Sequence, residues 1–182
     1  MAFYAYAAKR YGGESTGMER WELLDNKGNP TGETMVRGEK LKSGQYHLVV
    51  HIWIVDDTGR LLIQKRAPHL KLMPGVWAVT GGSAILGEDG ETAARRELSE
   101  ELGIGTEAGE MRHMGRLRRR NSFCDLWLLK SDVAAEELTL QAEEVARAQW
   151  VSWGKLMDMV NRRSFHNYGR EYFEYVRAHI FE

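Results

Sequence analysis

A chain of 182 residues, 43% of them apolar, has the length of a single domain and can build one substantial core. Lysine and arginine number 25 against 26 aspartates and glutamates, so the net charge of -1 creates no field that would steer the protein onto nucleic acid. The single cysteine, Cys124, excludes an intrachain disulfide, and no apolar run approaches the roughly 20 residues that span a bilayer, so we expect a cytoplasmic chain with no membrane partner.

The first 17 residues are predicted to be a flexible arm ahead of one domain that covers residues 18–182. This opening segment lacks the uninterrupted apolar stretch of a signal peptide. The domain then begins with an expected hairpin, because a strand pattern over Arg20 to Leu24 is followed by a turn from Asp25 to Pro30 and by a second arm near Glu33 to Arg37.

The central strands are predicted from two runs rich in β-branched and aromatic residues. Tyr46 to Val55 ends at a turn over residues 56–59, and Arg60 to Arg66 resumes the pattern, so the two runs should pair antiparallel in the middle of a sheet. A loop that contains two prolines leads to a short strand over Val76 to Thr80, which two glycines follow.

The rest of the chain alternates between helix and strand patterns. A helix is expected from about Gly90 to Leu102, and Gly103 stands at the usual C-terminal position to end it. The further expected elements are strands over Arg112 to Leu117, Ser122 to Lys130 and Ala148 to Val151, and helices over Trp153 to Val160 and Tyr168 to His179. Together these elements predict an α/β domain with helices packed on a mixed sheet.

Three glutamates of the predicted helix carry the first chemical signal. Glu97, Glu100 and Glu101 are spaced i, i+3 and i+4, which places three carboxylates on one face of the helix. An apolar stripe can hold the helix against a sheet, so the carboxylates would be presented by a fixed element. Clustered oxygens on such an element suit Mg²⁺ or Mn²⁺, whereas a solvated acidic face is the alternative reading of the glutamates alone.

The residues around these glutamates complete a longer pattern. Gly82 lies six residues before Glu88, Arg96 directly precedes Glu97, and Gly103 with Ile104 closes the helix, which reproduces G-x5-E-x7-R-E-U-x-E-E-x-G-U without a departure. Here the sequence resembles the Nudix hydrolase family. Looser similarity in PGVW (residues 74–77) and QWVSW (residues 149–153) extends the resemblance from about Trp21 to Trp153. The signal is very specific for the family and weak for the substrate.

The resemblance implies an α/β/α sandwich around a mixed β-sheet and a metal-dependent hydrolase that cleaves a phosphoanhydride. It assigns Glu97 and Glu101 as principal ligands of Mg²⁺ or Mn²⁺, Glu100 as a further ligand or the base, and the carbonyl of Gly81 as another ligand. It also implies that Arg96 orients these carboxylates by ion pairing.

Two more acidic positions follow from the same resemblance. Glu88 is expected to fix the loop before the helix rather than to touch the metal. Family members often recruit one more glutamate about six residues ahead of an aromatic residue in a late strand. Counting back from Trp150 gives Glu144, with Glu143 as the fallback and an ordinary surface role as the alternative for both.

The substrate side is less defined. Lys65, Arg66 and Lys71 lie on the strand and loop that lead to Trp77, so they are candidates to brace the negative charge of a diphosphate, and each also suits a solvent-facing role. The basic run from Arg116 to Arg120 reads as a solvated turn, with contact to a polyphosphate or RNA as the alternative. The expected partner is a small diphosphate-containing substrate, and a homodimer is compatible with the resemblance.

Two rival functions remain open. The N-terminal hairpin and PGVW also look like isopentenyl-diphosphate isomerase, which needs a catalytic cysteine after the tryptophan. Here residues 78–83 contain no cysteine, and Cys124 lies far downstream. The second rival is a nucleotide sensor that binds without cleaving. Such proteins typically lose glutamates of the motif, whereas this chain keeps Glu88, Glu97, Glu100 and Glu101.

Overall fold

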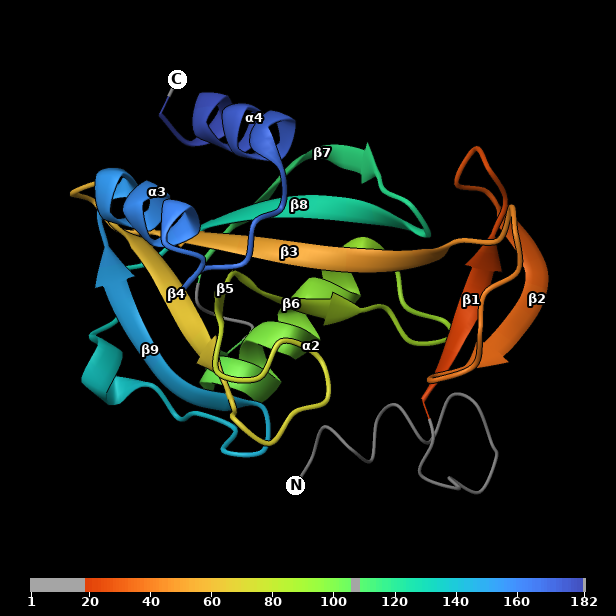
Figure 1. Ribbon diagram of the computed structural model, residues 1–182, viewed down its shortest axis with the longest axis horizontal. Coiled ribbons are helices and arrows are strands. Elements are labelled where there is room, and N and C mark those ends of the chain that lie inside the picture. The colour runs from red at the N-terminus through yellow and green to blue at the C-terminus, as the bar shows by residue number, and fades with distance from the viewer. Residues whose placement is uncertain (1–18, 106–108, 182) are drawn as a thin grey trace.

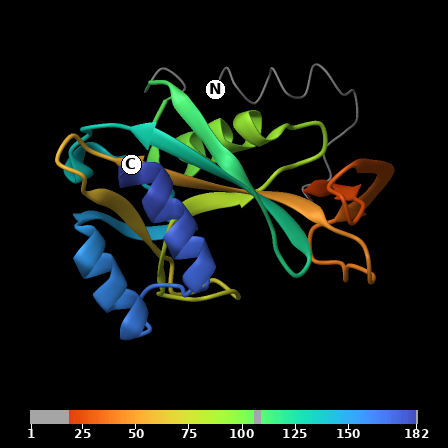
Figure 2. The same ribbon diagram turned by 90° about the horizontal axis from the view of Figure 1, so that it is seen from above.

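The computed structural model describes residues 19–105 and 109–181, so the predicted arm lies outside the described residues. A mixed sheet of seven strands lies between helix α2 (Gly90–Leu102) on one face and helices α3 (Trp153–Asn161) and α4 (Arg170–Phe181) on the other (Figures 1 and 2). The predicted α/β/α sandwich with a C-terminal helix is therefore confirmed. No helix of the described part of the chain is long and apolar enough to cross a bilayer.

Most predicted elements are present with shifted ends. The strands are β1 (Arg20–Leu24), β2 (Pro30–Val36), β3 (His47–Val55), β4 (Leu61–Arg66), β5 (Trp77–Ala78), β6 (Thr80–Ser83), β7 (Met111–Arg118), β8 (Ser122–Lys130) and β9 (Val145–Val151), with a short 3-10 helix η1 (Ala135–Glu137). β1 and β2 form the predicted N-terminal hairpin, which stands at one end of the large sheet (Figure 1). β9 begins earlier than predicted, and α4 begins at Arg170 rather than Tyr168.

The middle of the sheet differs from the expectation in one respect. β3 and β4 pair antiparallel as predicted, but only next to their connecting turn, at Ile54 and Val55. Beyond that point the two strands diverge, and the segment that follows β4 in sequence fills the gap. Its first strand, β5, pairs with β4, and its second strand, β6, pairs with β3. The single strand predicted over Val76 to Thr80 is therefore wrong, because this segment changes partner and continues through both glycines to Ser83.

Both faces of the sheet are covered, which explains why its central strands are almost uniformly apolar. Along β3, Trp53 and Val55 pack in the core beneath α3 and α4, and Ile52 and Ile54 pack in the core against α2. Successive side chains of a strand point to opposite faces, so one run of residues supplies both cores. His51 shares the face of Trp53, at the same level of the sheet as Gly81 of β6.

The hairpin contacts the large sheet through an aromatic pair, of which His47 is buried. The rings of Trp21 on β1 and His47 on β3 stack with centroids 4.3 Å apart and planes 9° from parallel. Burial lowers the pKa of His47 from 6.5 to about 4. As the pH falls, the unfolded chain binds a proton at this histidine before the folded protein does. The contribution of His47 therefore lowers the stability of the fold as the pH drops from about 6.5 to about 4. Below about pH 4 this contribution stays constant, because His47 is then protonated in both states.

We expect His47→Phe to flatten this pH dependence. Phenylalanine keeps a ring against Trp21 but binds no proton, so the drop in unfolding free energy between about pH 7 and about pH 5 should shrink by on the order of 1–2 kcal/mol relative to wild type. Urea unfolding at the two pH values measures the drop, and His69→Phe, at an exposed loop position, is the control. Equal drops in His47→Phe and wild type would contradict the assignment.

Candidate functional site

Helix α2 is fixed at both ends by local signals of the sequence. Asp89 caps its first turn by accepting the backbone N–H of Thr92 at 2.8 Å, and Gly103 ends it in the left-handed conformation with φ of 67°. The N-terminal turn also lies against a carboxylate from the sheet, since a β-carbon at Gly90 would come within 2.4 Å of Asp125. The side chains that α2 carries toward the sheet are therefore held by a rigid element.

Arg96 connects four parts of the site. Its guanidinium donates to Glu88 at 2.8 Å, to Glu97 and Glu100 at 2.9 Å each, and to the carbonyl of Ser83 at 3.0 Å. Burial by itself would lower the pKa of Arg96, but the bond to Glu88 and the nearby carboxylate charges outweigh it and raise that pKa. Glu88 also accepts the backbone N–H of Ile85 at 3.0 Å, so Arg96 and Glu88 together tie the loop before α2 to the helix.

Glu101 is the most deeply buried carboxylate of the group, with 2% of its surface exposed. One of its oxygens accepts the side-chain N–H of Gln64 at 2.8 Å and the backbone N–H of Gly81 at 3.2 Å. Burial raises the pKa of Glu101, and the neighbouring charge of Glu97 raises it further. Burial likewise raises the pKa of Glu97, although Arg96 opposes the shift. The site thus holds two buried carboxylates that would each gain from a positive partner.

The negative charge of Glu144 contributes to the raised pKa of both Glu97 and Glu101. The segment that precedes Glu144 is bonded to the end of α2. The backbone N–H of Thr139 donates to the carbonyl of Leu102, and that of Gln141 donates to the carbonyl of Glu101, both at 3.2 Å. Residues far apart in sequence are in this way brought to one acidic centre.

The two glycines before α2 are required by space. A β-carbon at Gly82 would lie 2.3 Å from Oε1 of Glu97, so the missing side chain makes room for that carboxylate. Gly81 has a φ of 150°, and a β-carbon there would lie 2.0 Å from the carbonyl oxygen of Val50 on β3. Both positions therefore exclude larger residues, for different reasons.

The donor atoms fit a hard divalent cation. Among residues 19–105 and 109–181, no three His, Cys, Asp or Glu side chains converge as a complete metal site. Two buried carboxylates, Glu97 and Glu101, are present, and beside them Oε1 of Gln64 is buried with no hydrogen-bond partner. Mg²⁺ and Mn²⁺ take few protein oxygens and fill the other positions with water and substrate oxygens, so this set is sufficient. Glu100 is exposed and bonded to Arg96.

The three cationic residues predicted to brace the substrate are not drawn into this acidic centre. Lys71 is exposed in the loop after β4, Nε of Arg66 donates to the carbonyl of Leu72 at 3.1 Å, and Lys65 is half-buried on β4. Within the described ranges, none of them forms an ion pair with the glutamates of α2. Their contact with a phosphate stays a prediction.

The sequence interpretation missed one residue of the site and the contacts of one basic run. The sequence indicates only that Gln64 is a polar residue near the end of a strand. Its neighbours in residues 60–66 do not indicate that its side chain bonds Glu101. The basic run from Arg116 to Arg120 read as a solvated turn, but Arg116 bonds Asp125 at 2.8 Å and Arg119 lies 5.4 Å from the ring centre of Tyr168. An aspartate in the buried strand SFCDLWLLK was the one available signal for the first of these contacts.

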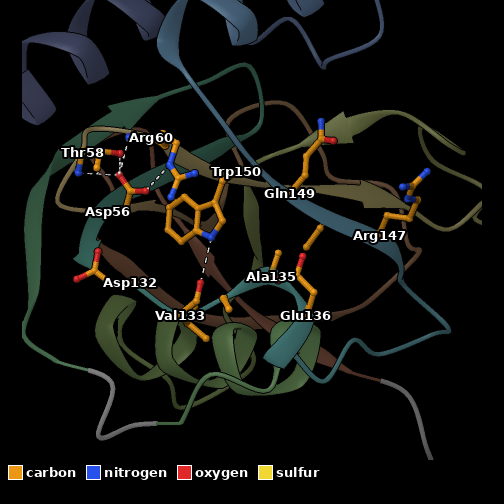
Figure 3. Close-up of a pocket in the computed structure, with 12 residues that line it drawn as sticks. Asp56, Thr58, Arg60, Asp132, Val133, Ala135, Glu136, Arg147, Gln149 and Trp150 are labelled. Atoms are coloured by element: carbon orange, nitrogen blue, oxygen red, sulfur yellow. Dashed lines mark hydrogen bonds and ion pairs between the residues drawn. The ribbon is translucent and has the colours of Figure 1, made fainter.

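A hollow in the surface lies away from these glutamates. A cavity of about 590 Å³ is bordered by β9, η1 and the turn between β3 and β4 (Figure 3). Arg60, which pairs with Asp56 at 2.6 Å, and Trp150, whose ring N–H donates to the carbonyl of Val133 at 3.0 Å, form part of its wall. None of the residues predicted for the site lines this hollow.

Comparison with known proteins agrees with this geometry. A family model described as NUDIX domain matches residues 45–174. A Nudix hydrolase of Listeria monocytogenes is 43% identical over 136 residues, which cover 74% of this chain and 80% of that protein. An isopentenyl-diphosphate Delta-isomerase of Brevibacterium linens is 29% identical over 153 residues, covering 79% and 82% of the two chains. The crystal structure of a Deinococcus radiodurans protein matches with a TM-score of 0.74 at 23% identity and covers 90% of this chain and 100% of that one.

Proposed function

This chain belongs to the Nudix family of hydrolases, and from that premise we propose that it cleaves the phosphoanhydride of a small diphosphate with the help of Mg²⁺ or Mn²⁺. The observation that carries the proposal is the pair of buried carboxylates, Glu97 and Glu101, beside the unpartnered oxygen of Gln64. Two like charges in a buried place are costly unless a cation joins them. A site built from such a pair therefore suits a bound divalent ion.

In this proposal some of the glutamates bind the metal ion, and one accepts a proton. Glu97 and Glu101 would hold the ion with the carbonyl of Gly81, and we assign Glu144, whose charge acts on both carboxylates, as a further ligand. When bound, the ion would neutralise diphosphate oxygens and lower the pKa of a water molecule. Glu101 or Glu100 would accept the proton of that water as it attacks phosphorus, and the leaving group would depart as a phosphate or a nucleotide.

The remaining site residues keep these oxygens in place. Arg96 bonds Glu97 and Glu100, so it orients two of the carboxylates, and Glu88 anchors Arg96 from the loop. On the substrate side, we assign the bracing of phosphate charge to Lys65, Arg66 and Lys71, because cationic side chains stabilise the charge that develops on the transferred group.

The isomerase function has one observation in its favour, the similarity to isopentenyl-diphosphate isomerases. The chemistry of Cys124 opposes it. This thiol is fully buried on β8, in the core beneath α3 and α4, whereas α2 covers the other face of the sheet. Burial also raises the pKa of the thiol to about 12, so it is a poor proton donor or nucleophile. Hydrolysis is therefore the better supported reaction.

A substrate panel tests the proposal directly. Nucleoside diphosphates, nucleotide sugars, dinucleotides and isopentenyl diphosphate are incubated with Mg²⁺ or Mn²⁺, and released phosphate and nucleotide are measured. We expect turnover that stops with a chelator and returns when metal is added back. Conversion of isopentenyl diphosphate into its allylic isomer would instead establish the isomerase. Tight binding of a nucleotide without turnover of any compound would establish a sensor.

A further inference from the structure

A second group of charged side chains lies on the face of the sheet away from α2. Arg119, at the end of β7, places its guanidinium 5.4 Å from the ring centre of Tyr168 and 5.8 Å from that of Tyr172. Tyr172 in turn bonds Nδ1 of His51 on β3 at 2.7 Å. These contacts hold the guanidinium of Arg119 over the two rings, so its charge has a defined position.

His166 and Arg66 extend this group. The ring of His166 lies 4.5 Å from that of Tyr168, and its backbone N–H donates to the carbonyl of Trp77 at 2.8 Å. Burial lowers the pKa of His166, and the positive charges of Arg119 and then Arg66 lower it further. Arg66 and His166 also bond neighbouring residues of one segment, because the backbone N–H of Arg66 donates to the carbonyl of Val76 at 3.0 Å.

No carboxylate balances this positive charge. Across the described ranges, neither Arg119 nor Arg66 has an aspartate or glutamate within ion-pair distance. Asp125, next to Cys124 on β8, is already paired with Arg116. The other groups on which the charge of Arg119 acts are two tyrosines, two histidines and the thiol of Cys124. A half-buried arginine without a counter-ion creates a positive potential that an anion would relieve.

The group is attached to the same segment as the acidic centre. The hydroxyl of Tyr168 accepts the backbone N–H of Val79 at 3.4 Å, two residues before Gly81, whose own N–H donates to Glu101. The chain from Trp77 to Gly81 therefore links the two sets of side chains, one on each face of the sheet.

We propose that Arg119 and His166 form a phosphate-binding subsite. The phosphate would come from the part of the substrate beyond its scissile diphosphate, or from free phosphate. The first of these sources rests on the proposed hydrolase function, and the second does not. Arg119 contributes the fixed guanidinium, which matches the geometry of phosphate oxygens, and the ring of His166 can add a donor.

Binding of inorganic phosphate tests the subsite without any turnover. The full chain is titrated calorimetrically in the presence of a chelator, and Arg119→Gln is compared with Arg120→Gln, which removes the same charge at the next, exposed position. We expect Arg119→Gln to weaken binding about tenfold or more, as the loss of a charged hydrogen bond implies, and Arg120→Gln to change it by less than about twofold. Arg119→Lys, which keeps the charge, should recover part of the affinity.

The result can be separated from a failure of the hydrolase assignment. Glu101→Gln should bind phosphate like wild type, since Glu101 lies on the other face of the sheet. If wild type binds no phosphate, or if Arg119→Gln binds it as tightly as wild type while both remain folded by circular dichroism, the subsite is overturned.

The source of the phosphate follows from kinetics. If the substrate carries it, Arg119→Gln raises KM for a nucleoside diphosphate with an added 3′-phosphate and leaves KM for the parent compound unchanged, with kcat unaffected for both. If it is free phosphate, neither KM changes while phosphate still binds through Arg119. Either pattern supports the subsite and assigns its ligand.

Discussion

Replacing Glu101 by glutamine is expected to lower kcat by about 10²- to 10⁴-fold, the range typical of losing a catalytic proton acceptor. The amide keeps the shape of the carboxylate and can still accept the N–H groups of Gln64 and Gly81, but it offers the metal no charge. The same change should not destabilise the metal-free fold, because burial and the charge of Glu97 already oppose ionisation of Glu101. Stability without metal should therefore be equal or higher.

Two measurements check this pair of expectations. Initial rates with saturating Mg²⁺ give kcat, and urea unfolding in a chelator gives the free energy of unfolding. Glu91→Gln is the matched control, because Glu91 lies in the first turn of the same helix and is exposed. Retention of more than about a tenth of wild-type kcat in Glu101→Gln would remove Glu101 from the reaction.

Gly82→Ala is expected to abolish most activity with a smaller effect on folding. The added β-carbon would lie 2.3 Å from Oε1 and 2.6 Å from Cδ of Glu97, so this carboxylate must move and its bond to Arg96 must break or bend. Overpacking of this kind costs about 1–3 kcal/mol of stability. A displacement of about 1 Å in a reacting group can lower the rate about 100-fold, so kcat should fall by at least that factor.

Gly154→Ala provides the control for this substitution. Gly154 lies in α3, a β-carbon there meets nothing within 4 Å, and alanine in a helix stabilises by about 0.5–1 kcal/mol relative to glycine. Kinetics and urea unfolding of the two variants separate the effects. Wild-type kcat in Gly82→Ala would show that Glu97 need not occupy its present position for catalysis.

Local signals predicted the elements that carry the site. The helix from Gly90 to Leu102 has the expected bounds because Asp89 and Gly103 act on its own ends. The strands before it depend on distant partners. The segment from Trp77 to Ser83 divides into two strands because β3 and β4 diverge, and no pattern within the segment encodes that divergence.

Site residues that lie on one element could likewise be predicted from the sequence, whereas those that depend on distant partners could not. Glu97, Glu100 and Glu101 share one helix, so their spacing was enough to place them together. Gln64 reaches them only because β4 passes beneath α2, and its neighbours in sequence give no sign of this contact. Arg119 belongs to a run of basic residues, and its position over two tyrosines depends on how α4 docks on the sheet.

Because Cys124 is buried, the rate at which its thiol is alkylated measures how often the folded protein opens. Cys124 is the sole cysteine of the sequence, and no part of it is exposed in the folded protein. An alkylating reagent can therefore react only after the sheet beneath α4 opens, and the labelling rate reports how often that opening occurs. Metal and substrate that bind only the closed form will slow the labelling in proportion to their affinity. Each variant can be ranked in this way without an added probe.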